Sequence, residues 1–252
     1  MRGLWIALAL LATPAAAQAP DAAATRAEQM GRLIYDQDQA AWYGTDELRR
    51  QVTDLPKTGG WIVEPHDGLL RVTFYGSDTG APLAFFWADM RGQLVTASHV
   101  VAPSEEARLT PRQARMAQAR GIALEQGKRP CTEAAFNTVV VSPDNEAAPV
   151  SVYLLSAMTK TGVYPLGGHY RVDVGSDGHV VGGRDFTKAC FNLDTTAAPP
   201  DGVAGITHLM DPYPTEIHVF ASLWMGKPLY VMTGPDAIWV VDRGVIRRAK
   251  GG

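Results

Sequence analysis

The densest group of side chains that could carry chemistry lies between Gly205 and His218. Two imidazoles and two carboxylates fall within 11 residues there, namely His208, Asp211, Glu216 and His218. Imidazole and carboxylate groups are common zinc ligands, and a catalytic zinc site takes three of them together with a water molecule. These four residues are therefore candidate metal ligands, with His208 and Glu216 as candidate catalytic residues.

The spacing of these residues limits what they can share. Glu216 and His218 lie two positions apart at the start of a predicted helix, so their side chains point about 200° apart and cannot bind one ion. His208 can still combine with one of the others, but that supplies two ligands where zinc needs at least three. The structural alternative is that Asp211 or Thr215 caps the helix while Glu216 complements its positive N-terminal end. We favour capping over zinc.

The order of elements over residues 203–247 resembles the core of the JAMM/MPN metallopeptidases: a strand, a loop with histidine, an amphipathic helix and a closing hairpin. That family carries His-x-His-Pro, then Ser-x-x-Asp at a helix start, and an upstream catalytic Glu. Here Ile206 stands at the first His, His208 at the second and Tyr213 at the Ser, and Glu216 takes the place of the Asp. With one imidazole missing, too few ligands remain for a water-activating zinc ion. The resemblance therefore implies a non-catalytic relative.

Other catalytic patterns are also incomplete. Residues 94–101 resemble the segment around the catalytic histidine of trypsin-like serine proteases, but the sequence contains neither the Gly-Asp-Ser-Gly-Gly run of that family nor a Gly-x-Ser-x-Gly motif. We therefore expect His99 to be an ordinary strand residue.

The N-terminal segment has the pattern of an export signal. Arg2 precedes a nine-residue apolar run, residues 4–12, and an Ala-Gln-Ala sequence ends at Ala19. The run is well short of the roughly 20 residues of a membrane-spanning helix, and no later segment reaches that length. We predict a signal peptide over residues 1–19 and a mature protein that is soluble and either periplasmic or secreted.

Cysteine content and charge agree with that location. Cys131 and Cys190 are the only cysteines, and two thiols in an oxidising compartment usually pair. A bridge across a loop of this length stabilises by up to about 4 kcal/mol. Without residues 1–19, 22 basic side chains face 26 acidic ones, a net charge of −4. A mildly acidic chain without a basic run is not expected to bind nucleic acid.

The hydrophobic pattern predicts a single α+β domain, residues 20–252, with two packed halves, 20–130 and 131–252, as the alternative. Residues 20–29 are expected to form a frayed leader that overlaps a helix over 23–41. Trp42–Gly44 should break that helix, and Thr45 should cap a second one over 46–52. Four strands should follow as an antiparallel meander, over 61–63, 69–75, 82–87 and 93–101.

The second part of the chain predicts further helices and hairpins. Thr110 and Pro111 should start the main helix within 103–126, and Gly226 should end a helix over 217–224. The remaining strands are expected over 138–141, 150–155, 170–174, 179–181, 203–207, 229–233 and 238–241.

Together these patterns favour an exported protein of the bacterial envelope that binds or supports another molecule and is not an enzyme. Its ligand, protein or small molecule, is not identified by the sequence. One form of this hypothesis is a module that recognises its partner through a sheet edge or an aromatic groove. The competing hypothesis is a JAMM-like metal-dependent hydrolase that uses the four candidate ligands.

Overall fold

The structure is a computed structural model that describes residues 18–55, 59–76, 81–105, 107–196, 199 and 202–249. The first 17 residues of the predicted signal peptide lie outside this part of the chain. The helices are α1 (Gln18–Gln51), α2 (Pro111–Leu124) and α3 (Glu216–Met225), with a 3-10 turn, η1 (Pro103–Glu105). Within the described residues, none of the helices combines the length and the apolarity needed to cross a lipid bilayer.

The strands form three larger antiparallel or mixed sheets and one small one within the described residues. The first is the meander β1 (Gly59–His66), β2 (Leu69–Gly76), β3 (Leu83–Arg91) and β4 (Leu94–Val100). The second has the order β5-β6-β8-β9, with β5 (Asn137–Val141), β6 (Val150–Leu155), β8 (Tyr170–Val174) and β9 (Val180–Asp185). The third has β11 (Ala204–Thr207), β12 (Leu229–Gly234), β13 (Ala237–Asp242) and β14 (Val245–Arg248) in that order, and β7 (Val163–Pro165) pairs with β10 (Asn192–Asp194).

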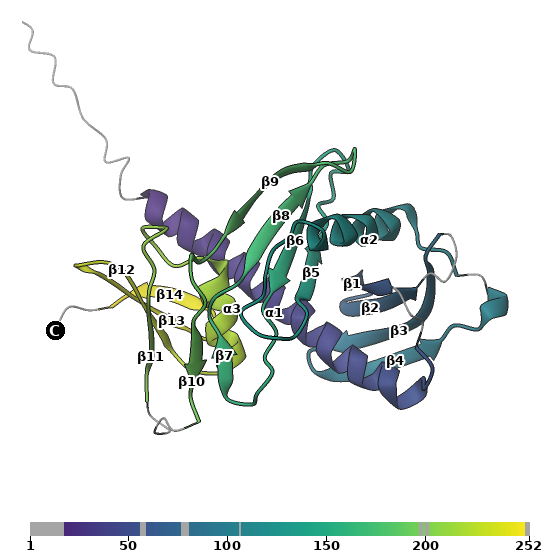
Figure 1. Ribbon diagram of the computed structural model, residues 1–252, viewed down its shortest axis with the longest axis horizontal. Coiled ribbons are helices and arrows are strands. Elements are labelled where there is room, and N and C mark those ends of the chain that lie inside the picture. Colours follow the sequence, from purple (N-terminus) through teal and green to yellow (C-terminus); the bar gives the residue numbers. More distant parts are fainter. Residues whose placement is uncertain are drawn as a thin grey trace, which may run out of the picture.

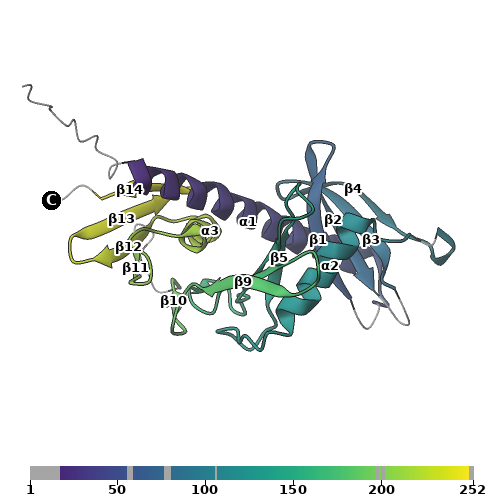
Figure 2. The same cartoon turned by 90° about the horizontal axis from the view of Figure 1, so that it is seen from above.

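These sheets lie in a row along α1. Figure 1 shows α1 running from the β11–β14 sheet to the β1–β4 meander, with the β5–β9 sheet and α2 between them. The view from above agrees, with α1 along one side of the molecule (Figure 2). The predicted α+β fold, with N-terminal, middle and C-terminal helices, is confirmed.

The N-terminal helix differs from the prediction. It is one helix over Gln18–Gln51, so the predicted leader over 20–29 and the break at Trp42–Gly44 are both wrong. Tertiary packing explains the missing break, because Gly44 lies so close to the meander that a Cβ there would be 2.4 Å from a methyl carbon of Val72. The hydroxyl of Thr45 does not cap a second helix but donates to the Ala41 carbonyl at 2.7 Å, inside the same helix.

Local signals predicted the other helices and the turns well. Thr110 is the N-cap of α2, and its hydroxyl accepts from the Gln113 backbone N–H at 3.2 Å while the Gln113 side chain accepts from the Thr110 N–H at 3.0 Å. At the C-terminus of α3, Gly226 has φ +62°, the left-handed conformation that glycine adopts without strain. The strands β7, β10 and β14 were not predicted.

The core consists of several apolar clusters along this row. One joins the meander, α2 and the β5–β9 sheet; its buried members include Ile62, Met116 and Val152. Another joins α1 and α3 to the β11–β14 sheet. The helices α1 and α3 approach closely at Gly31, where a Cβ would lie 2.4 Å from Cβ of Val219. The predicted disulfide between Cys131 and Cys190 is confirmed.

Candidate functional site

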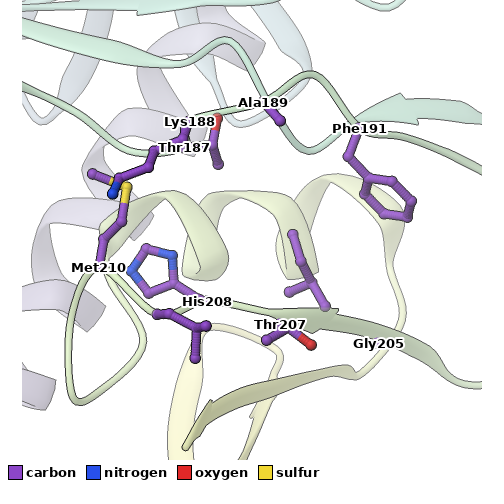
Figure 3. Close-up of a pocket in the computed structure, with 10 residues that line it drawn as sticks. Thr187, Lys188, Ala189, Phe191, Gly205, Thr207, His208 and Met210 are labelled. Atoms are coloured by element: carbon purple, nitrogen blue, oxygen red, sulfur yellow. The ribbon is translucent and has the colours of Figure 1, made fainter.

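A cavity of about 550 Å³ opens beside β11 (Figure 3). One wall is β11 with the residues that follow it, and the other is the segment 187–191, which leads into β10. We call this cavity the β11 groove. Its lining residues are Thr187, Lys188, Ala189, Phe191, Gly205, Ile206, Thr207, His208, Leu209 and Met210.

The wall opposite β11 is held in place at several points. Cys190 is tied to Cys131 by the disulfide. The carbonyl of Phe191 accepts from the Leu166 N–H at 2.8 Å, and the Thr187 hydroxyl accepts from a backbone N–H at 3.2 Å. The disulfide therefore braces one side of the groove as well as closing a long loop.

The groove is lined mainly by apolar side chains, and several of them are exposed. Leu209 is 76% exposed, Phe191 44% and Met210 40%. Figure 3 shows Phe191 reaching from the upper wall towards β11. Adjacent exposed apolar side chains are uncommon on proteins that act alone and are typical of binding surfaces.

The strand β11 also offers unpaired backbone to the groove. Among the described residues it is the end strand of its sheet and pairs with β12 only. The His208 N–H donates to the Met232 carbonyl of β12 at 2.8 Å. Because successive N–H groups of a strand point to opposite edges, the N–H and carbonyl groups of Gly205 and Thr207 point away from β12. Both residues line the groove.

A chain of polar contacts ends in the groove at His208. Its ring is buried, only 3% exposed, and its Nε2 lies 2.7 Å from Oδ2 of Asp211. The same carboxylate accepts from both terminal nitrogens of Arg184 on β9, at 2.5 and 3.2 Å. Burial acts to raise the pKa of Asp211, but the hydrogen bonds from Arg184 and His208 outweigh it and hold this pKa below its usual value.

His218 lies against His208 but has a structural role at the start of α3. Thr215 is the N-cap, and its backbone N–H donates to Nδ1 of His218 at 3.0 Å. Since an N–H can only donate, Nδ1 carries no proton and the ring is neutral with its proton on Nε2. Burial lowers the pKa of His218 to about 3, and the neighbouring His208 adds to the shift. Of the two predicted caps, Thr215 occupies the N-cap and Asp211 does not.

Glu216 is separated from this group. Its carboxylate faces the opposite side of the first turn of α3, where it accepts from the Tyr153 hydroxyl at 3.2 Å and lies 3.9 Å from the Arg171 guanidinium. The structure thus brings His208, Asp211 and His218 together and leaves Glu216 apart. The two histidine ring centroids are 4.6 Å apart.

The geometry of this group decides what chemistry it can do. Across the described residues, no set of three or more His, Cys, Asp or Glu side chains is arranged to hold a metal ion. A His–Asp pair can also activate a hydroxyl nucleophile. In the part of the chain that the structure describes, however, no hydroxyl lies within hydrogen-bond distance of the His208 ring.

Sequence reasoning missed two residues that matter here. Arg184 follows a Gly-Gly pair in a hairpin strand, 27 residues before its partner Asp211, and nothing local marks it. Asp38 on α1 lines a separate cavity. Its signal was visible, because it lies four residues after Ile34 and three before Ala41, within the predicted apolar stripe of the helix.

No protein-family model matches this chain, and the curated proteins and solved structures contain no significant match to it either.

Proposed function

We propose that this chain is an exported binding protein that holds an extended, apolar segment of a partner protein in the β11 groove. The observation that carries the proposal is the coincidence of a free strand edge with exposed apolar side chains along one cavity. An extended peptide can pair with such an edge through its backbone and place alternate side chains in the adjoining groove. Gly205 and Thr207 supply the backbone groups, and Phe191 and Leu209 supply apolar contacts.

A peptide experiment tests this function. The probe is a capped, fluorescently labelled heptapeptide of alternating Val and Thr, compared with the same peptide carrying N-methyl groups on every amide. Fluorescence anisotropy should show saturable binding of the parent peptide only, because the methylated backbone cannot donate hydrogen bonds to β11. Equal binding of both peptides, or no binding of either, would contradict the proposal.

A matched pair of variants locates the binding. Leu209→Asp should weaken peptide binding by about tenfold or more, because it puts a charge into an apolar contact. Leu94→Asp on β4 is the control, since Leu94 is also highly exposed, at 64%, but lies in the meander. The same loss in both variants would mean that the peptide does not bind in the groove.

Export has separate support. The apolar run that ends at Ala19 has the pattern of a signal peptide, and the Cys131–Cys190 disulfide fits an oxidising compartment, the periplasm or the medium. N-terminal sequencing of the natural product should find the chain cleaved near Ala19, and thiol titration should find no free cysteine. A product that begins at Met1 and has free thiols would contradict export.

A metal-dependent hydrolase of the JAMM-like type is the second candidate; it would have to use His208, Asp211 and His218, which lie together beside the groove but are not arranged to hold a metal ion. Zinc at Nδ1 of His208 would leave the bond from Nε2 to Asp211 in place, but zinc at His218 would have to compete with the Thr215 N–H for the lone pair of that ring. This candidate predicts stoichiometric zinc in protein purified without chelator, and hydrolysis that is lost in His208→Ala. Metal analysis that finds no zinc would exclude it.

A further inference from the structure

A second cavity, of about 300 Å³, lies where α1 packs against β1 of the meander and β5 of the neighbouring sheet. It is separate from the β11 groove and shares none of its lining residues. We call it the Asp38 cavity. Its lining residues are Asp38, Ala41, Trp42, Thr45, Asp46, Arg49, Trp61, Asn137, Ala157 and Met158.

Asp38 is the unusual member of this lining. Its side chain is buried, with the residue only 4% exposed, yet its hydrogen bonds are long: 3.3 Å from Nδ2 of Asn137 and 3.5 Å from Nε2 of Gln39. In the described part of the chain it forms no ion pair with Lys, Arg or His. A buried carboxylate normally has a cation or several strong donors, and this one has neither.

The other charges of the cavity leave this carboxylate uncompensated. Asp46 and Arg49 are the remaining charged side chains that line it, both on α1 and both exposed. The meander, β5 and the segment 157–158 contribute only uncharged lining residues. The lining therefore holds two carboxylates against one guanidinium, which favours a cationic ligand.

Aromatic rings supply the rest of a cation site. Trp42 is 40% exposed at the cavity, and among the described residues no side-chain cation stacks on its ring. Trp61 shows that such stacking suits this region, since the Arg120 guanidinium lies 4.6 Å from its ring centroid. The face of an indole ring attracts cations, most strongly where water is partly excluded.

We propose that the Asp38 cavity binds a small organic ammonium ion, which donates N–H hydrogen bonds to Asp38 and rests its carbon body against Trp42. The volume suits a small molecule, at the lower end of the range for ligand pockets. A bare metal ion fits less well, because Asp38 is the one buried carboxylate of the lining, and with the Asn137 amide beside it too few oxygen ligands converge. This proposal does not depend on the function of the β11 groove.

The test uses benzylamine as the probe and benzyl alcohol as its uncharged counterpart, with isothermal titration calorimetry on the full-length mature protein at about pH 8. Benzylamine should bind saturably at one site, about tenfold or more tightly than benzyl alcohol. Asp38→Asn should weaken benzylamine binding by about tenfold or more, and Trp42→Ala by about threefold or more. The matched control, Asp36→Asn, changes an exposed carboxylate on the same helix and should leave binding unchanged.

The pH dependence gives a second readout. Burial raises the pKa of Asp38 to about 6, so benzylamine binding should weaken as the pH falls through that value and the carboxylate gains a proton. Asp38→Asn should lack this dependence. The proposal is overturned if folded wild-type protein shows no saturable benzylamine binding, if benzyl alcohol binds equally well, or if the Asp38 and Asp36 variants bind alike.

Discussion

Replacing Asp38 by Asn should stabilise the folded protein at neutral pH. The asparagine keeps the shape of the side chain and its contact with Asn137 but carries no charge to bury. In the wild type, burial raises the pKa of Asp38 from 3.8 to about 6, and the hydrogen bonds from Gln39 and Asn137 only partly oppose that rise. The folded protein therefore bears the cost of an ionised, poorly compensated carboxylate at neutral pH.

The size and sign of the effect follow from this pKa. One pKa unit corresponds to about 1.4 kcal/mol, so a rise from 3.8 to about 6 converts to at most about 3 kcal/mol. Because the folded state holds this proton more tightly than the unfolded chain, the contribution of Asp38 to stability is most favourable below about pH 4. It falls between about pH 4 and pH 6 and is constant above that range. Asn cannot lose a proton and avoids the fall.

Urea unfolding of both proteins with the disulfide intact, at about pH 4 and pH 8, measures the difference. The free energy of unfolding of Asp38→Asn should exceed that of the wild type by up to about 3 kcal/mol at pH 8. At pH 4 the difference should be close to zero. Asp36→Asn, on the same helix but exposed, should change the free energy of unfolding by less. The reasoning is refuted if Asp38→Asn is less stable than the wild type at pH 8, or if its effect is the same at both pH values.

Three further predictions concern the scaffold. Replacing Cys131 and Cys190 by Ala should lower the free energy of unfolding by up to about 4 kcal/mol, measured in urea; an unchanged midpoint would contradict the role of the bridge. Gly31→Ala should destabilise the folded protein by about 2 kcal/mol, because its Cβ would overlap α3. Gly121→Ala has open space beside it on α2 and should stabilise the protein by up to about 1 kcal/mol. Thermal unfolding measures both changes. Asp211 has a lowered pKa, so its stabilisation is present above the unfolded value and is lost as the pH falls through the folded one. Asp211→Asn should therefore destabilise by about 1–3 kcal/mol at pH 7 and by less near pH 2, as acid unfolding curves would show.

Local chemistry explains which elements were predictable. The turn between β1 and β2 has Asp67 at φ +49° and Gly68 at φ +75°, the two positive values of a tight hairpin turn, and an Asp-Gly pair is a strong signal for it. The start of α2 at Thr110 was predictable because the cap and its partner are three residues apart. These interactions need no distant part of the chain.

The errors come from contacts that a local pattern cannot contain. Trp42–Gly44 has a composition that often ends a helix, but in α1 the glycine is needed because Val72 of the meander packs against it. A helix propensity is a small preference that tertiary packing can override. The strand β14 has four residues, which is too short for an alternation of polar and apolar residues to mark it as a strand, and its pairing with β13 is not visible in a local pattern.

The candidate site was predictable only in part, for the same reason. His208 and Asp211 lie three residues apart, so their pairing was accessible to sequence reasoning. Arg184, which completes that group, arrives from a different sheet. For Asp38, the signal was the position of its charge. It lies on the apolar face of the predicted helix, and a carboxylate on a face that packs into the core needs either a partner or a ligand.

The polar group around His208 is best understood as a tether that fixes one wall of the β11 groove. Hydrogen bonds join Arg184 of β9 through Asp211 to His208, which follows β11, and the His208 ring packs against the His218 ring of α3. Nε2 of His208 is engaged with Asp211, and Nδ1 of His218 accepts from the Thr215 N–H at the start of α3. A group whose hydrogen bonds join β9 to the segment after β11 keeps the free edge of β11 at a fixed distance from segment 187–191. That fixed distance is what a groove for an extended chain requires, since a preformed site lowers the ordering cost of binding.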